Sequence, residues 1–191
     1  MNETSEVKEV PEQKTFLERM RLLHFSHPFL NKKPDPFNFE TDGDKAKDFA
    51  TDLVKAMFKF GGVGLSANQV GFNWRVFVFG TEDTQFAMFN PLIIALSKEQ
   101  ETFEEGCLSF PDFTLTLTRP SAIAITYQDV EGVWQTANFS GVSARIIQHE
   151  YDHMEGINFT HHASEFKLKR ELKKWQNVQK KKIRSMVQKV N

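Results

Sequence analysis

The segment His149-Glu150-Tyr151-Asp152-His153 constrains the fold of this chain more than any other part of it. If the two histidines bind one metal ion, the segment is best placed on an α-helix, because residues four apart in a helix share a face. Glu150 then lies beside the ion, where it can move protons for a bound water. Two imidazole nitrogens leave an ion under-coordinated, so a third protein ligand is required. Two surface histidines on a helix would give the same pattern without a metal.

Cys107, the only cysteine, is one candidate for the third ligand. A thiolate binds borderline divalent metals well, and a Cys-His-His set leaves a fourth position for water, as in catalytic sites. A lone cysteine is more often a small buried hydrophobic residue, but a preceding glycine and a nearby proline indicate a tight turn here. In ordinary H-E-x-x-H proteases the third ligand lies downstream, where His161, His162 and Glu165 are available. Spacing alone leaves both alternatives open.

The rest of the pattern predicts an α+β fold, with mostly antiparallel β-sheets around a central metal-binding helix, an N-terminal helix and a C-terminal basic helix. Apolar residues at helical spacing predict the three helices at about 44–60, 141–154 and 165–189. Segments rich in Val, Ile and Phe predict strands at 74–79, 85–90, 91–96, 115–118, 122–128 and 133–139. Ser140 is the predicted N-cap of the central helix, and residues 129–132 form a predicted hairpin turn.

A chain of 191 residues, 40% of them hydrophobic, has the size of one ordinary domain with a sizeable core. No stretch approaches the ~20 apolar residues of a membrane-spanning helix. Residues 1–14 are predicted to be a flexible leader. The start of the chain is acidic and polar, with neither the apolar core of a signal peptide nor the Arg-rich character of a transit peptide. One cysteine cannot form an internal disulfide, which favours a reducing compartment. We therefore expect a cytoplasmic protein without a membrane partner.

The charge is distributed unevenly along the chain. Residues 165–191 contain ten Lys or Arg and two Glu, a local balance of +8, and the whole chain has a net charge of −1. The preceding part therefore carries −9. A basic segment on an acidic domain suggests attachment to a polyanion such as the ribosome. A solvated helix with lysines on its exposed face is an equally good interpretation of the charge.

Three motifs occur in a fixed order: G-V-G-L-S-A-N-Q at 62–69, E-G-C-L-S at 105–109 and Q-H-E-Y-D-H at 148–153. With these motifs the chain resembles the peptide deformylase family over about residues 15–160. It departs from the family pattern at Ser66, where alanine is usual. It also lacks the acidic residue that often follows Gly156. We divide the chain into a leader (1–14), a catalytic domain (15–164) and a basic C-terminal helix (165–191).

The resemblance implies a complete active site. The metal would be Fe²⁺, with Zn²⁺ or Ni²⁺ as possible substitutes. The implied metal ligands are Cys107, His149 and His153. The residues implied for catalysis are Glu150 as general acid and base, Gln69 and the backbone N–H of Leu108 as donors to the oxyanion, and Gly64, whose backbone approaches the substrate.

Two further groups of residues are assigned less directly. Glu105 and Arg119 match family positions, either as an ion pair that braces the motif or in contact with substrate. An apolar pocket for the methionine side chain is expected from four residues between and beside the motifs. These residues are Val63, Phe103, Val142 and Ile146.

The implied reaction is hydrolysis of the N-formyl group from the N-terminal methionine of nascent polypeptides, with release of formate. The C-terminal helix of bacterial relatives contacts the ribosome, so the basic segment of this chain is expected to do the same; no DNA partner is expected. The enzymatic alternative is an H-E-x-x-H metallopeptidase, which would not need Cys107. A non-catalytic ribosome- or peptide-binding relative is the other alternative, and it would need neither Glu150 nor Gln69.

Overall fold

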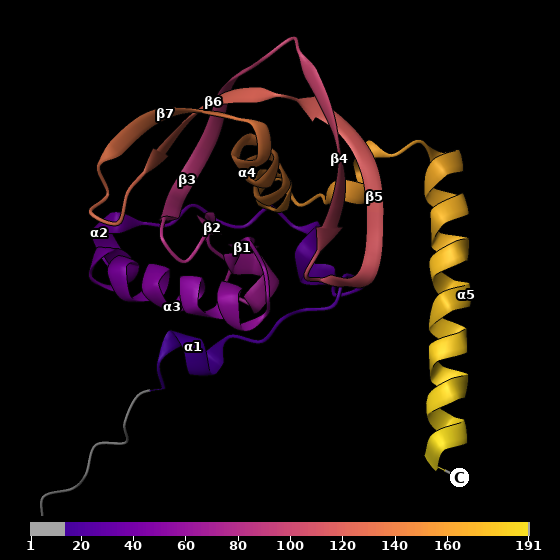
Figure 1. Ribbon diagram of the computed structural model, residues 1–191. Coiled ribbons are helices and arrows are strands. Elements are labelled where there is room, and N and C mark those ends of the chain that lie inside the picture. The colour runs from indigo at the N-terminus through magenta and orange to yellow at the C-terminus, as the bar shows by residue number, and fades with distance from the viewer. Residues whose placement is uncertain (1–13, 191) are drawn as a thin grey trace, which may run out of the picture.

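Helix α4 (Gly141–Met154) lies at the centre of the computed structural model, which describes residues 14–190 (Figure 1). An antiparallel five-stranded sheet in the order β1-β2-β3-β6-β7 packs on one side of α4, and the β4–β5 hairpin lies on the other. The strands are β1 (Gly64–Ser66), β2 (Val76–Gly80), β3 (Gln85–Leu96), β4 (Gln100–Cys107), β5 (Phe110–Pro120), β6 (Ala122–Gln128) and β7 (Trp134–Ser140). The predicted α+β class with antiparallel sheets is confirmed.

Within residues 14–190, four further α-helices and four 3₁₀ helices surround this frame. Helix α5 lies alongside the β4–β5 hairpin and extends beyond its end (Figure 1). The α-helices are α1 (Phe16–Arg19), α2 (Phe39–Asp42), α3 (Ala46–Lys59) and α5 (Glu165–Val190). The 3₁₀ helices are η1 (Pro28–Asn31), η2 (Gly43–Lys45), η3 (Ala67–Val70) and η4 (Phe159–His162). No helix within residues 14–190 is long and apolar enough to cross a membrane.

The helices follow from apolar spacing in the sequence. Helix α3 has the predicted position within two residues, and its buried face consists of Ala46, Phe49, Ala50, Leu53, Ala56 and Met57. Gly61, with a φ of 76°, lets the chain leave the helix. Helix α4 has the predicted bounds. Ser140 is the N-cap residue, as predicted, although its side chain makes no capping hydrogen bond.

The strand predictions for β2, β6 and β7 are accurate to within two residues, but the strand predicted at 115–118 is only part of the longer β5. Strand β6 has the predicted bounds, and β7 pairs with it through the predicted hairpin turn. The two strands predicted at 85–90 and 91–96 are one strand, β3. The pairing of β3 with β6 shifts after Phe89, where Asn90 has a φ of 49°, so the strand is irregular at the predicted boundary.

Strand β4 was not predicted, because its one fully buried side chain is that of Glu105 rather than an apolar residue. Cys107 was expected on a turn; it is instead the last residue of β4, followed by a two-residue turn. Residues 62–71 include the first of the three motifs and form a glycine-rich segment. They contain strand β1, which pairs with β2, and helix η3. The predicted leader lies outside the described residues, except for Lys14.

Three hydrophobic clusters hold these elements together. The first joins α3 to β1 and β2, and includes Leu53 and Phe49. The second lies between α4 and the five-stranded sheet, around Ile147 and Ile125. The third is formed by β5 and Phe159, and α5 packs against it. The metal motif of α4 therefore lies between the second and third clusters.

The first cluster is predicted to provide much of the stability. Leu53 is fully buried, so Leu53→Ala should lower the free energy of unfolding by about 2–5 kcal/mol through lost contacts and a residual cavity. Urea unfolding followed by tryptophan fluorescence measures this change. Leu96→Ala is the matched control, because Leu96 is 56% exposed and its truncation should cost less than about 0.5 kcal/mol. Equal losses in the two variants would contradict the assigned core.

Candidate metal centre and substrate cavity

Cys107, His149 and His153 come together where β4 ends against α4. Their potential ligand atoms all lie within 4.8 Å of one another. Cys107 Sγ is 3.5 Å from His153 Nε2, and the two imidazole rings are 5.4 Å apart on one face of the helix. One thiolate and two imidazoles are a donor set that suits a borderline divalent metal.

The Glu105 carboxylate organises the surroundings of this set. It receives two hydrogen bonds from Arg119, both 2.8 Å, and one of 2.8 Å from Arg145. His149 Nδ1 lies 3.1 Å from Glu105 Oε2, which leaves His149 Nε2 for a metal. Arg119 also pairs with Asp152 at 2.9 Å. Two arginines and two carboxylates thus balance their charges inside the protein, and the brace expected of Glu105 and Arg119 is the arrangement observed.

This network sets the ionisation of the candidate ligands. Burial disfavours the charged form of Glu105, but hydrogen bonds from His149 and Arg119 outweigh it and lower its pKa. Burial likewise opposes the Cys107 thiolate, yet the His153 charge and hydrogen bonds from both histidines lower its pKa to about 5. Hydrogen bonds to Cys107 and Glu105 overcome burial and raise the pKa of His149 to about 10. A thiolate beside a proton-binding imidazole is a pair in which a metal ion can take the place of the proton.

Glu150 faces the same space from α4. Burial has the largest effect on the Glu150 carboxyl and raises its pKa to about 7. The Glu150 Oε2 atom has no hydrogen-bond partner among residues 14–190. Gly64 of β1 lies directly against it, because a Cβ at Gly64 would be 2.5 Å from Glu150 Oε1 and 2.8 Å from Ile146 Cγ2. Only glycine therefore lets β1 approach the helix this closely.

The Gln69 side-chain amide is held in one orientation. Its Nε2 donates to Cys107 Sγ at 3.3 Å and to Ser109 Oγ at 3.1 Å. Its Oε1 accepts from the Ser66 backbone N–H at 3.0 Å. The Ser66 hydroxyl, the departure from the family pattern, lies 2.9 Å from Gln69 Oε1 and 2.8 Å from Asn68 Oδ1. The extra oxygen is therefore accommodated by acceptors already present.

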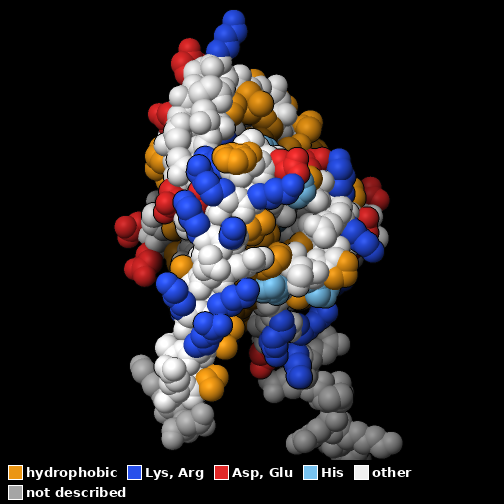
Figure 2. Space-filling view, turned by 90° about the vertical axis from the view of Figure 1, so that its right-hand side faces the viewer, with side chains coloured by type: hydrophobic (Ala, Val, Ile, Leu, Met, Phe, Trp, Pro, Cys, Tyr) orange, Lys and Arg blue, Asp and Glu red, His pale blue; other side chains and the backbone are white. Residues whose placement is uncertain are grey.

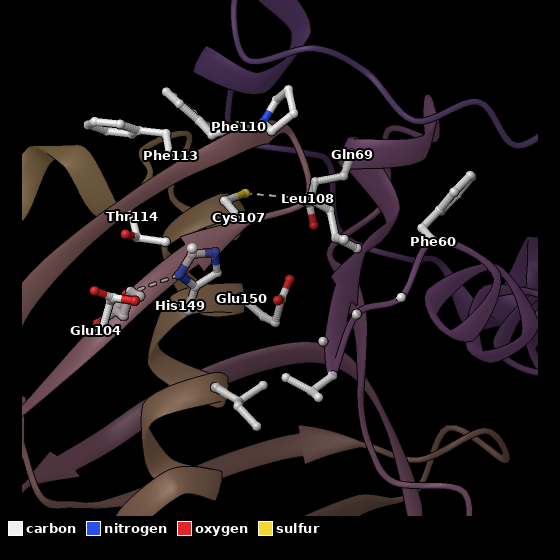
Figure 3. A pocket seen from close by; sticks show the side chains of 18 of the residues that line it. Phe60, Gln69, Glu104, Cys107, Leu108, Phe110, Phe113, Thr114, His149 and Glu150 are labelled. Atoms are coloured by element: carbon white, nitrogen blue, oxygen red, sulfur yellow. Dashed lines mark hydrogen bonds and ion pairs between the residues drawn. The ribbon is translucent and has the colours of Figure 1, made fainter. Parts of the chain in front are cut away.

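A cavity of about 620 Å³ opens beside these groups (Figure 3). In Figure 3, Cys107, His149, Glu150 and Gln69 face one space between the hairpin, α4 and the β1 segment. The residues predicted for a methionine pocket, Val63, Phe103, Val142 and Ile146, all line it, as do Gly64, Glu105 and Leu108. Arg119 does not line it, which favours the bracing role over contact with substrate.

Sequence reasoning missed several residues of this cavity. Phe110, Pro111 and Phe113 form one wall, and their position directly after the E-G-C-L-S motif was the available signal. Phe60 contributes from the end of α3. Arg145 also lines the cavity, with its guanidinium 5.1 Å from the Phe103 ring centre. Nothing in the spacing of the sequence distinguishes this arginine from a surface one.

The downstream alternatives for a third ligand have other partners. His161 Nδ1 contacts the backbone of Asn158. His162 Nε2 lies 2.8 Å from Asp152 Oδ2, and Glu165 pairs with Lys169 at the start of α5. Within the described residues, Cys107 and the two histidines of α4 form the one group that could hold a metal.

Comparisons with known proteins agree with this geometry. Residues 19–170 match the family described as polypeptide deformylase. The chain belongs to the peptide deformylase family. A peptide deformylase of Treponema pallidum (strain Nichols) is 40% identical over 140 residues, which cover 73% of this chain and 85% of the relative.

Solved structures of peptide deformylases have the same fold. The crystal structure of the Thermotoga maritima peptide deformylase is 34% identical with a TM-score of 0.71, and covers 76% of this chain and 97% of that one. A probable peptide deformylase from Synechococcus phage S-SSM7 has the same identity and TM-score, with coverages of 75% and 99%. The chain is therefore a metal-dependent hydrolase that removes the N-formyl group from nascent polypeptides.

The Glu105 network predicts a defect in metal binding. Glu105→Gln removes the negative charge that orients His149, so metal affinity should fall about 10–100-fold. Competition with a chromophoric chelator measures the affinity, and circular dichroism verifies the fold. Glu104→Gln is the matched control, since Glu104 is the exposed neighbour on the same strand. If both variants bound metal as tightly as the parent deformylase, the Glu105 network would have no role in metal affinity.

Proposed function

We propose that Cys107, His149 and His153 hold one divalent metal ion, Fe²⁺ in the cell, with Zn²⁺ or Ni²⁺ as substitutes. The observation that carries this proposal is the convergence of their ligand atoms within 4.8 Å. Thiolate and imidazole donors suit all three ions. Three protein ligands leave a position open for water or substrate. The hydrogen bond between Glu105 and His149 supports this assignment of ligands, because it fixes the orientation of the imidazole ring.

Glu150 is the proposed proton carrier. When bound, the ion supplies Lewis-acid chemistry, which activates water and polarises a carbonyl group. Glu150 accepts the proton as the water oxygen bonds to the formyl carbon. As the carbon–nitrogen bond breaks, Glu150 returns that proton to the leaving amine, and formate departs. The unpartnered Oε2 atom, buried at the cavity, supports this role.

Gln69 and Leu108 are the proposed donors to the negative charge that develops on the formyl oxygen. The Gln69 Nε2 already points to the metal set, and Leu108 follows Cys107 directly at the cavity. A donor that is fixed before the reaction needs no reorganisation, and losing one typically costs about 10²–10³ in rate. Gly64 keeps the opposite wall open at Glu150.

Val63, Phe103, Val142 and Ile146 are proposed to receive the methionine side chain of the formylated peptide. All four are apolar and line the same cavity as Glu150. Val63 and Val142 are more than half exposed, so a bound side chain would cover apolar surface that is now in contact with solvent. That burial favours an apolar side chain over a charged one.

The metallopeptidase and non-catalytic alternatives are less well supported. A metallopeptidase of this motif class would take its third ligand from downstream, where the described histidines have other partners. A binding protein would need neither a buried, unpartnered carboxylate nor an oriented amide beside the thiol. Both features are present together.

Anaerobic purification followed by metal analysis and formate release from a formyl-Met peptide tests the proposed centre. We expect about one Fe²⁺ per chain and formate production that a chelator abolishes. Cys107→Ser should abolish metal-dependent activity. Formate release by Cys107→Ser at the parent rate would exclude Cys107 as a ligand.

Glu150→Gln should reduce kcat about 10²–10⁴-fold with metal content unchanged, because the amide cannot carry the proton. Steady-state formate release and metal analysis of the same preparation separate these two properties. Glu131→Gln, an exposed glutamate in the β6–β7 turn, is the control and should retain parent activity. Near-parent kcat in Glu150→Gln would assign the proton transfer to another group.

We also propose that residues 15–164 form the catalytic domain of a cytoplasmic enzyme, and that basic residues 165–191 attach it to the ribosome. Lys and Arg side chains gather along the face of α5 that points away from the domain (Figure 2). Such a row of charges suits the phosphates of ribosomal RNA. The single cysteine supports a reducing compartment.

Charge reversal tests the ribosome proposal. Lys173, Lys180 and Lys181 are exposed on α5, so changing all three to Glu should abolish co-sedimentation with ribosomes at low salt. Formate release from a short peptide should be unaffected. Unchanged co-sedimentation of the triple variant would refute the attachment.

A further inference from the structure

One wall of the cavity is formed by a part of β5 that makes no strand pairing with β4. In the hairpin, Gly106 pairs with Thr114, and the next residue, Cys107, pairs with Phe110. Residues 111–113 therefore bulge from β5 without a partner on β4, and we call them the wall bulge. The wall bulge lines the cavity directly beside the strand end that carries Cys107.

Trp175 of α5 supports the wall bulge from behind. Its indole Nε1 donates a hydrogen bond of 3.0 Å to the Pro111 carbonyl oxygen. Its ring meets Phe113 edge-on at 5.9 Å and Phe25 at 6.1 Å. Phe25 in turn stacks on Phe110 at 4.3 Å. The helix thus supplies the backbone partner and aromatic packing that the hairpin ladder does not.

Asp112, in the middle of the wall bulge, is held by the same helix. Its φ of 60° lies in the left-handed region, which costs a non-glycine residue free energy. Its Oδ2 accepts hydrogen bonds from Lys182 Nζ at 2.9 Å and Gln179 Nε2 at 3.2 Å. Trp175 thus binds Pro111, and Gln179 and Lys182 both bind the next residue, Asp112.

We propose that α5 is part of the substrate-binding structure, and that Trp175, Gln179 and Lys182 are positioning residues for the wall bulge. Pro111 and Asp112 line the cavity and are exposed, whereas Glu150 in the same cavity is buried. The wall bulge therefore meets the residues that follow the formyl-methionine, and its position sets their binding rather than the chemical step. This inference rests on the proposed function of the cavity.

Steady-state kinetics with a formylated dipeptide and a formylated tetrapeptide tests the proposal on the full-length, metal-loaded chain. Trp175→Ala should raise KM for the tetrapeptide about three- to tenfold, the size of one lost aromatic contact and hydrogen bond. The double variant Gln179→Ala/Lys182→Ala should raise it about two- to fivefold, since its ion pair is exposed. In both variants kcat, and KM for the dipeptide, should change less than about twofold, because the reacting groups are untouched.

Two controls isolate the effect. Lys181→Ala removes a charge from α5 next to Lys182, and Trp134→Ala removes an exposed tryptophan from β7. Both should retain the parent KM for the tetrapeptide.

The outcomes are distinguishable. If the parent enzyme released no formate from the dipeptide, the proposed function would fail. If the parent were active and the tetrapeptide KM were unchanged in both test variants, the role of α5 would be refuted. Equal losses with both peptides would mean a general structural defect and would also refute it. If Trp175→Ala did not fold, the tetrapeptide KM of the Gln179→Ala/Lys182→Ala variant would decide whether α5 has this role.

Discussion

The candidate metal site depends on the interactions of the buried Glu105 carboxylate. Glu105 lies on β4, and its partners come from β5 through Arg119 and from α4 through Arg145 and His149. Each charge here would be costly to bury alone, and breaking such a pair is strongly destabilising. The hairpin and the helix are therefore joined by a network in which every member needs the others. Cys107, two residues after Glu105, is brought to the histidines by the same contact.

The glycine-rich segment completes the site from the other side. The Asn68 side chain donates to the His153 backbone carbonyl at 2.9 Å, which ties η3 to the last turn of α4. The neighbouring Gln69 amide points to Cys107. Two adjacent residues thus fix the helix and contribute a group to the cavity. A small displacement of this segment would weaken the hydrogen bonds of Asn68 and of Gln69 together, since hydrogen bonds depend steeply on distance and angle.

Much of this arrangement could be predicted from the sequence, for identifiable physical reasons. Helix α4 and strand β6 have strong periodic patterns, and three motifs in order located the residues around the cavity. Strand β4 could not be predicted, because burial there belongs to Glu105 and not to apolar residues. The wall bulge was missed for a related reason. It depends on Trp175, 64 residues away from Pro111, and no local pattern encodes such a contact.

The convergence of candidate metal ligands from β4 and α4 has a consequence for the stability of the protein in the cell. A metal ion bound there would cross-link Cys107 to His149, 42 positions later in the sequence, in a chain whose single cysteine can make no internal disulfide. Binding to the folded state alone adds stability that grows with the free metal concentration. The fraction of folded protein would then follow the supply of the bound metal, so a cell short of that metal would lose the enzyme to proteolysis as well as to inactivity.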